Sequence, residues 1–291
     1  MSGDAGAGGG PARGTASGGV LLGPAEIRDL AALLDVTPTK KLGQNFVHDA
    51  NTVRRIVRTA GVTAGDVVVE IGPGLGSLTL GLLEAGASVV AVEIDGRLAT
   101  QLPLTVGALL PDAALTVLHE DAMRLSGLPQ RPTRLVANLP YNISVPVLLH
   151  LLPLVPSLES GVVMVQAEVG ERLAAPPGSR VYGSPSVKAA WYGRWRTAGT
   201  VSRQVFWPVP NVDSILVGFE RTPEPGDEEL RRTTFGLVDA AFGQRRKMLR
   251  QSLSSVLGPE ASDRITAAGL DPTRRGEDWP LSSFLALARS L

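Results

Sequence analysis

The sequence predicts an α/β protein in which a doubly wound, mostly parallel sheet precedes a small all-helical domain. Three observations support this prediction. Short apolar runs typical of buried parallel strands alternate with helical patterns between residues 66 and 166. A glycine-rich turn follows the first of these runs and opens a helix, as in doubly wound folds. From residue 228 onward only helical periodicity remains.

Apolar runs bounded by turn residues predict the strands of the sheet. The runs are residues 67–71, 88–93, 115–119, 134–138 and 161–166. Helical patterns lie between several of them, among these about 76–86 and 145–153. Because strands and helices alternate, the connections should be crossovers and the strands mostly parallel. A last strand over 214–220 is expected to complete the sheet.

The chain divides into three parts by composition. Residues 1–19 contain eight glycines and are expected to be a flexible tail, because they cannot bury enough surface to offset the entropy of ordering. A helical pattern begins near Gly23, and residues 222–227 have the composition of a linker. We therefore predict a sheet-containing domain over 20–223 and a helical domain over 224–291.

The overall composition excludes several classes of protein. The 291 residues are 44% hydrophobic and 19% charged, which suits a large buried core and not a disordered chain. The chain has no cysteine, which excludes a disulfide framework, a cysteine zinc site and a thiolate nucleophile, and no metal site is expected. The lack of cysteine agrees with a cytoplasmic location. No continuous apolar run is long enough to suggest a membrane span.

A glycine turn and a distant carboxylate form the first candidate binding site. Gly72, Gly74 and Gly76 follow the first strand, where glycine permits a sharp turn and the close approach of a ligand. Glu93 ends the second strand, where its carboxylate can accept hydrogen bonds from both hydroxyls of a ribose. The spacing G-x-G-x-G is compatible with NAD or with S-adenosylmethionine (SAM). A strand-to-helix turn without a ligand is the alternative.

Asp121 follows the third strand and has two possible roles. Its carboxylate could accept a hydrogen bond from the amino group of a bound adenine. It could equally cap a helical turn that begins at Ala122, because aspartate is a favoured capping residue. The sequence alone leaves both roles open.

The tetrapeptide Asn138-Leu139-Pro140-Tyr141 ends the fourth strand, at the edge where open α/β sheets bind ligands. The Asn138 amide oxygen can accept from an exocyclic amino group, and Pro140 should aim the Leu139 and Pro140 carbonyls outward. Two acceptors that hold both hydrogens of an adenine amino group favour a pyramidal nitrogen, whose lone pair can then attack a methyl donor. Tyr141 offers a flat face for stacking on the base. The alternative is an ordinary turn with Tyr141 in the core.

Ordered blocks of the chain, from about residue 38 to about residue 256, resemble the ribosomal RNA adenine N6,N6-dimethyltransferase family. The blocks are 43–46, 70–76 with Glu93, 121–123, 138–144, 206–214 and 241–247. The extended block at 138–144 and the Gln-Arg-Arg-Lys run at 244–247 look like the housekeeping, small-subunit branch of that family.

The resemblance implies a fold, a cofactor and a substrate. The fold is that of the class I SAM-dependent methyltransferases, with a Rossmann-like sheet, and the cofactor is SAM. The substrate is a pair of adjacent adenosines in the 3′-terminal hairpin loop of 16S rRNA within the 30S subunit, with a role in small-subunit biogenesis. A cytoplasmic monomer is expected. The alternative is the antibiotic-resistance branch, which methylates 23S rRNA but resembles this chain less near the C-terminus.

The resemblance also assigns cofactor-binding residues. The methionine part of SAM would contact Asn45 and Val47, with Gly72 and Gly74 lying under the cofactor, and its ribose and adenine would bind Glu93 and Asp121; Asn138 would contact both SAM and the target amine. Val47 departs from the leucine that is usual in the family, which is a mild change for a backbone contact.

Catalytic residues follow from the same resemblance. Asn138, Leu139, Pro140 and Tyr141 would hold the target adenine, which must leave the RNA stack before chemistry can take place. Phe206 would stack on the opposite face of the flipped base.

Two long stretches without an acidic residue predict the RNA-binding surface. Residues 172–212 contain six basic side chains interleaved with Trp191, Tyr192 and Trp195, and residues 240–259 contain four more basic side chains. Basic and aromatic side chains together suit phosphate contact and base stacking. The predicted RNA-binding residues are Lys40, Lys41, Arg194, Arg196, Arg203, Arg245, Arg246, Lys247 and Arg250.

The overall charge balance hides this asymmetry. The chain has 28 basic and 28 acidic residues, so its net charge is zero. The two acid-free stretches together carry +10, which leaves −10 on the remainder, including the half that would hold a cationic cofactor. Two further hypotheses make the chain a non-catalytic ribosome-assembly or transcription factor, or an NAD-dependent dehydrogenase. The first would have an eroded site, and the second would need a hydride-transfer site that we do not recognise.

Overall fold

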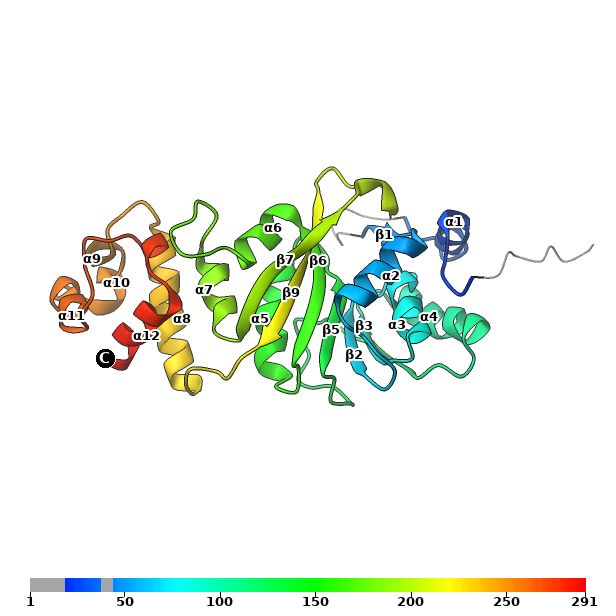
Figure 1. Cartoon of the computed structure of the whole chain (residues 1–291), viewed down its shortest axis with the longest axis horizontal. Coiled ribbons are helices and arrows are strands. Elements are labelled where there is room, and N and C mark those ends of the chain that lie inside the picture. Colours follow the sequence, from blue (N-terminus) through cyan, green and yellow to red (C-terminus); the bar gives the residue numbers. More distant parts are fainter. Residues whose placement is uncertain (1–18, 38–43) are drawn as a thin grey trace, which may run out of the picture.

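The computed structural model describes residues 19–37 and 44–291 of the chain. A twisted central sheet carries helices on both faces, and further helices pack beyond the β7 edge of the sheet (Figure 1). The strand order is β4-β3-β2-β5-β6-β9-β7. The tail predicted over residues 1–19 lies outside the described residues, apart from Gly19, and so do Lys40 and Lys41.

The parallel part of the sheet confirms the five strands predicted between residues 67 and 166. They are β2 (Val67–Ile71), β3 (Ser88–Glu93), β4 (Leu115–His119), β5 (Arg134–Asn138) and β6 (Ser160–Gln166). Both β3 and β5 pair with β2, so the direction of winding reverses at β2. A crevice forms at such a switch point, beyond the carboxyl ends of the strands.

Two antiparallel strands extend the sheet beyond β6. β9 (Ser214–Arg221) confirms the predicted last strand and pairs with β6 along its length. β7 (Gly193–Val201) forms the outer edge against β9. Because β9 runs against its parallel neighbours, its first residue lies at the edge where β5 and β6 end.

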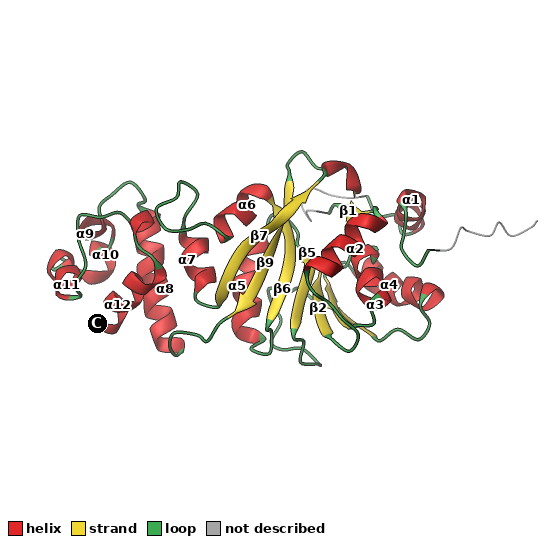
Figure 2. Cartoon of the chain, in the orientation of Figure 1, coloured by secondary structure: helices red, strands yellow, loops and turns green. Residues whose placement is uncertain are grey.

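Helices cover the sheet in two layers (Figure 2). One layer is α2 (Ala50–Thr59), α3 (Ser77–Glu84) and α4 (Gly96–Leu109), joined by α1 (Pro24–Leu33); the other is α5 (Ser144–Leu154), α6 (Ala167–Leu173) and α7 (Ser184–Ala190). Alternate strand residues serve the two layers, as a period of two requires. In β5, Val136 joins the first cluster of apolar side chains, whereas Leu135 and Ala137 join the second.

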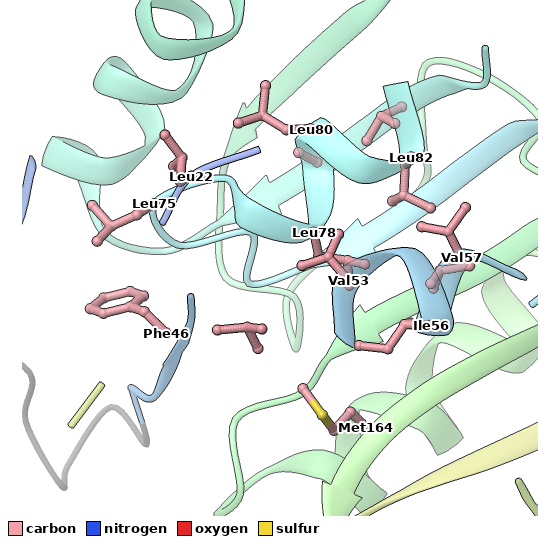
Figure 3. Packing of buried hydrophobic residues seen from close by; sticks show 14 of the residues in the cluster. Leu22, Phe46, Val53, Ile56, Val57, Leu75, Leu78, Leu80, Leu82 and Met164 are labelled. Atoms are coloured by element: carbon pink, nitrogen blue, oxygen red, sulfur yellow. The ribbon is translucent and has the colours of Figure 1, made fainter. Parts of the chain in front are cut away.

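The first layer is tightly packed where α2 meets α3. Val53, Ile56 and Val57 of α2 lie against the leucines of α3, above Met164 of β6 (Figure 3). Gly81 of α3 permits this approach, because a Cβ placed there would lie 2.3 Å from Cγ1 of Val53.

A two-stranded sheet sits over the carboxyl ends of the parallel strands. β1 (Phe46–Val47) pairs antiparallel with β8 (Phe206–Trp207), which follows the short 3-10 helix η2 (Arg203–Val205). A further bond from the His48 N–H to the Val205 carbonyl extends the pairing. Two predicted blocks, distant in sequence, thus become neighbours.

The C-terminal part of the chain is helical, as predicted. It consists of α8 (Glu228–Gly243), α9 (Leu249–Ser252), α10 (Ser254–Leu257), α11 (Ala261–Ala267), η3 (Gly276–Asp278) and α12 (Leu281–Arg289). Its core also includes Tyr182 and Val187, which precede the linker. The division at residues 223 and 224 therefore stays a prediction.

The junction between the two parts overturns one expectation. Trp191 and Tyr192 are completely buried, and the ring of Phe235 from α8 packs edge-on against both. Lys188 and Arg231 lie over the same Phe235 ring. The prediction that Trp191 and Tyr192 stack on RNA is wrong, because these side chains are buried in the interface between the sheet and the C-terminal helices.

Six α-helices and strands were not predicted: β1, β7, β8, α2, α6 and α7. β1 and β8 have two residues each and form only through each other. β7 is an edge strand whose exposed arginines conceal its period, and α6 and α7 have seven residues each. Tertiary contacts, and not local periodicity, define these five. α2 differs, because its buried Val53, Ile56 and Val57 have helical spacing that the sequence analysis overlooked.

Replacing Gly81 with alanine should destabilise the protein. Alanine normally favours a helix over glycine by up to about 1 kcal/mol. At Gly81, however, the new methyl group meets stiff Val53 in a closely packed interface, and overpacking of this kind costs about 1–3 kcal/mol. Gly107→Ala in α4 is the control, because no atom lies within 4 Å of a Cβ there. In urea unfolding, Gly81→Ala should lower stability and Gly107→Ala should preserve or raise it. Equal effects would contradict the packing argument.

Candidate active site

A cavity lies at the switch point, beneath the two-stranded sheet. Its wall is formed by the carboxyl ends of β2, β3, β4 and β5, by the start of α3 and by β1. Every residue predicted to bind the cofactor lies on this wall: Asn45, Val47, Gly72, Gly74, Glu93, Asp121 and Asn138. Residues up to 93 positions apart thus meet at one site.

The glycine turn at this site requires glycine. Gly72, Gly74 and Gly76 have φ angles of 68°, 58° and 95°, in the left-handed region that favours glycine. A Cβ at Gly74 would lie 2.8 Å from the Phe46 ring, and one at Gly76 would lie 2.6 Å from Leu102. The turn therefore brings bare backbone to the cavity and starts α3 with its N–H groups near it.

Glu93 is held in a defined orientation. It is 4% exposed, and its two carboxylate oxygens accept from the N–H groups of Gly74 at 3.1 Å and Asp95 at 2.9 Å. Burial raises the pKa of Glu93, while these two backbone bonds oppose the rise. The bond to Gly74 also couples the carboxylate directly to the glycine turn.

Glu70 is a second buried carboxyl group on the cavity wall. It is 1% exposed, and the Thr79 hydroxyl donates to it at 2.6 Å. Burial, with a smaller contribution from the negative charge of Glu93, raises the pKa of Glu70 to about 8. From the sequence, Glu70 was placed in the first strand and in the block 70–76, but was assigned no role at the site. Two buried acids facing one cavity favour a ligand that carries positive charge.

Asp121 makes the capping bond, and its role toward a bound adenine stays a prediction. Its Oδ1 accepts from the Met123 N–H at 2.9 Å, which is the capping arrangement. The residue also lies on the cavity wall, as the glycine turn does. Capping holds the carboxylate in place, and its second oxygen, Oδ2, forms an ion pair with Nε of Arg124 at 3.9 Å.

The amide of Asn138 is oriented by the backbone of Asn45. Nδ2 of Asn138 donates to the Asn45 carbonyl at 2.9 Å. A carbonyl can only accept, so the amide must present its NH₂ group to Asn45, which leaves Oδ1 as an acceptor. Asn138 is half-buried on the cavity wall.

The carbonyls that follow Asn138 differ from the expectation. The Pro140 carbonyl does not face outward as a free acceptor, because it accepts from the Ile143 N–H at 3.3 Å and from Ser144 Oγ at 2.8 Å. These bonds begin α5. The Leu139 carbonyl accepts no hydrogen bond from the described residues and is the available acceptor. The Leu139 side chain itself is buried in the core.

The two aromatic candidates have different surroundings. Tyr141 is half-buried, and its hydroxyl lies 2.6 Å from Ser214 Oγ. Phe206 is 1% exposed and lies opposite Val47 in the β1–β8 pair, within the core cluster. Neither residue is on the wall of the cavity itself.

The predicted RNA-binding arginines are mostly ion-paired. Arg194 and Arg196 both approach Glu220, at 3.4 Å and 3.9 Å, and Arg203 pairs with Asp213 at 2.6 Å. Arg245 pairs with Glu277 at 2.9 Å. Within residues 19–37 and 44–291, three exposed members of the set make no ion pair: Arg246, Lys247 and Arg250.

Ser77 is a site residue that the sequence analysis missed. It is the first residue of α3, directly after Gly76, and its Oγ lies on the cavity wall, buried, with no hydrogen-bond partner in the described structure. A buried hydroxyl without a partner suits a polar ligand. Its position at the helix start was the available signal.

Residues 19–37 and 44–291 contain no cluster of three or more His, Cys, Asp or Glu side chains that could hold a metal ion. Nor does the described part contain a helix that is long and apolar enough to cross a membrane.

Comparisons with known proteins agree on one family. A family model described as ribosomal RNA adenine dimethylase matches residues 37–291. Ribosomal RNA small subunit methyltransferase A of Leifsonia xyli subsp. xyli is 74% identical over 273 residues, which cover 92% of this chain and 98% of that protein. The protein of the same name from Nocardia farcinica is 58% identical and covers 95% of this chain and 97% of its own length.

Solved structures share the fold. A dimethyladenosine transferase from Plasmodium falciparum superposes with a TM-score of 0.68 at 23% identity, covering 83% of this chain and 95% of that chain. The 23S rRNA methyltransferase ErmE gives a TM-score of 0.64 at 25% identity, covering 85% of this chain and 99% of its own.

The wild-type protein should lose stability as the pH rises, because Glu70 ionises, and Glu70→Gln should remove this loss. A carboxyl group whose pKa rises on folding stabilises the fold at low pH, and this contribution is lost as the pH rises through the folded-state pKa, here about 8. Glutamine keeps an acceptor for Thr79 but cannot ionise. Between pH 5 and pH 9 the melting temperature of the wild type should fall further than that of the variant, by about 2–4 °C per kcal/mol.

The control for this measurement is Glu229→Gln, at an exposed position on α8. It should follow the wild type at every pH. Parallel curves for the wild type and Glu70→Gln would mean that Glu70 is already ionised in the folded protein at neutral pH.

Proposed function

The chain belongs to the ribosomal RNA adenine dimethylase family, and we propose that it methylates N6 of two adjacent adenosines in the 3′-terminal hairpin loop of 16S rRNA in the 30S subunit. The enzyme uses SAM, and the reaction is the dimethylation of adenine in small-subunit rRNA. The observation that carries the proposal is the orientation of the Asn138 amide, whose free acceptor oxygen lies at the wall of a cavity suited to SAM. We place this activity in the biogenesis of the small subunit, in the cytoplasm, with the protein as a monomer.

The cavity residues fit the parts of SAM by their chemistry. When bound, SAM supplies a methyl group made electrophilic by a positively charged sulfonium. Glu93 would accept from the ribose hydroxyls, and Asp121 would accept from the adenine amino group. Asn45 and Val47 would contact the methionine part, and the glycine turn would lie beneath it. Two buried carboxyl groups in the wall, Glu70 and Glu93, favour the cationic cofactor over its neutral product.

Ser77 is our addition to this set. Its buried hydroxyl lacks a partner in the described structure and lies where the N–H groups of α3 begin. A hydroxyl and free N–H groups together suit a carboxylate, and the amino-acid end of SAM carries one.

Asn138 and Leu139 would hold the target amine. Oδ1 of Asn138 and the carbonyl of Leu139 are two acceptors, one for each hydrogen of the adenine amino group. Holding both hydrogens out of the ring plane would localise the nitrogen lone pair, so that the nitrogen could accept the methyl group that bound SAM would supply. No strong base is needed, because the proton leaves after the nitrogen has become positively charged. Pro140 contributes its rigid ring. Its carbonyl accepts from Ser144 at the start of α5, so it does not serve as an acceptor for the target amine.

Tyr141 and Phe206 would bracket the flipped adenine. Tyr141 lies between Pro140 and Ile143, which both line the cavity, and therefore at the rim of the cavity, where its ring would stack on the base. Phe206 is a buried residue of the β1–β8 pair itself, so contact with the base would require this pair to shift on binding.

The RNA would bind across the rim and the helical part. Arg246, Lys247 and Arg250 are exposed and unpaired in the described structure, so they can meet phosphates without first breaking an ion pair. Arg194, Arg196, Arg203 and Arg245 would have to exchange or share their acidic partners. Residues 20–223 would then carry the chemistry, and residues 224–291 would position the RNA. Lys40 and Lys41 would complete the surface.

A 23S rRNA substrate is the competing proposal. Its support is the likeness to ErmE, whose identity of 25% is far below the 74% and 58% of the small-subunit relatives. We therefore retain it only as an outcome of the test.

The substrate can be tested directly. Purified protein with methyl-labelled SAM should label 30S subunits from a strain that lacks this modification, and mass spectrometry should locate the label at N6 of two adjacent adenosines near the 3′ end. Fully modified 30S subunits serve as the control and should accept no label. Labelling of 50S subunits or free 23S rRNA instead would establish the competing substrate.

Asn138→Ala should abolish most of the transfer while the protein stays folded. The variant loses one of the two acceptors that localise the lone pair, and the loss of a comparable site hydrogen bond lowers kcat by about 10²–10³-fold. Turnover should be measured at saturating SAM, with circular dichroism to confirm folding. Asn51→Ala, at an exposed position of α2, is the control. Turnover of Asn138→Ala at the wild-type rate would refute the role.

A further inference from the structure

A hydrogen bond joins the rim residue Tyr141 to Ser214, which lies 73 positions away along the chain. The phenol oxygen and Ser214 Oγ are 2.6 Å apart. Ser214 is 1% exposed, whereas Tyr141 is only half-buried. The bond therefore ties the tip of a partly exposed ring to a fixed point in the interior.

The topology of the sheet makes this contact possible. Tyr141 follows the end of β5, and β6 separates β5 from β9. Because β9 is antiparallel to β6, its first residue, Ser214, pairs with Gln166 at the very end of β6. A parallel strand in the place of β9 would end at this edge, and its first residue would lie at the opposite one.

Ser214 is a rigid anchor. Its backbone pairs with Gln166 on one side and with Val201 of β7 on the other. The preceding residue, Asp213, accepts from the Ala167 N–H through its carbonyl at 2.8 Å. Its carboxylate accepts two bonds from Arg203, at 2.6 Å and 2.9 Å. The hydroxyl of Ser214 is thus held by three strands and a bidentate ion pair.

We propose that Ser214 is a positioning residue for methyl transfer, because its hydroxyl holds the Tyr141 ring in the orientation that stacks on the target adenine. The inference rests on the function proposed above. A tyrosine ring has two side-chain torsions, and a bond at its far end restricts both. The phenol hydroxyl then serves to hold the ring and takes no part in proton transfer. In agreement, burial raises the pKa of Tyr141, so the phenol stays protonated at neutral pH.

Three variants test the coupling between the two residues. Ser214→Ala removes the anchor, and Tyr141→Phe removes the phenol hydroxyl but keeps the ring. Each should lower kcat/KM for unmodified 30S subunits by roughly threefold to tenfold, the range expected for one hydrogen bond, with the KM for SAM unchanged. The double variant should lose no more than either single variant, because both remove the same interaction.

Ser157→Ala is the matched control. Like Ser214, Ser157 is a serine whose hydroxyl makes one hydrogen bond, which it donates to the Pro132 carbonyl at 2.8 Å, although Ser157 is half-buried and Ser214 is buried. It precedes β6 and so lies at the opposite edge of the sheet. This variant should have wild-type kcat/KM. Wild-type activity of Ser214→Ala, or losses that multiply in the double variant, would overturn the proposal.

A second measurement is independent of the reaction. The chain has three tyrosines, so fluorine NMR of protein labelled with 3-fluorotyrosine should give a simple spectrum in which Tyr141→Phe identifies one resonance. Ser214→Ala should shift or broaden that resonance alone, and Ser157→Ala should leave it unchanged. An unchanged Tyr141 resonance in Ser214→Ala would refute the anchoring. Failure of the wild type to methylate 30S subunits would instead refute the proposed function.

Discussion

The hydrogen bond from the Asn138 amide to the Asn45 carbonyl is the interaction on which the proposed chemistry depends. An amide side chain can present either its oxygen or its nitrogen to a ligand, and only the oxygen can accept from an adenine amino group. The Asn45 carbonyl selects the productive orientation. It can do so because β1 is held over the cavity by its pairing with β8. The two short strands therefore connect the cofactor site, the reacting amide and the segment that precedes Ser214.

The arrangement of buried charge supports the same chemistry. Glu70 and Glu93 are both removed from water on one cavity wall, and burial raises the pKa of each. The positive charge of a sulfonium would favour the ionised form of both carboxyl groups and lower their pKa values, whereas the neutral product would have no such effect. The basic side chains lie elsewhere, at the rim and on the helical part. The zero net charge of the chain conceals a separation between an acidic interior site and a basic surface.

Much of the fold followed from periodicity, because five parallel strands buried on both faces leave continuous apolar runs. The sequence also predicted residues that the structure brings together around one cavity: the glycine turn and Glu93 carry local signals, whereas Asn45 and Val47 came from the family resemblance. The sequence did not predict which side chains would form ion pairs or packing contacts with residues that are distant along the chain. Arg203 and Arg194 lie in acid-free stretches yet meet Asp213 and Glu220 from β9 and the segment before it. Trp191 was expected to be available for stacking, but its ring packs against Phe235 of α8. No local sequence signal shows that the Ser77 hydroxyl lacks a hydrogen-bond partner in the described structure.

The most direct test is a crystal structure with the SAM analogue sinefungin and adenosine. The account predicts that adenosine N6 lies about 3 Å from both Asn138 Oδ1 and the Leu139 carbonyl oxygen, with the base stacked on Tyr141 and Nδ2 of Asn138 still bound to the Asn45 carbonyl. An adenosine whose N6 is bound by the Pro140 carbonyl, or an Asn138 amide turned so that Nδ2 faces the cavity, would contradict it.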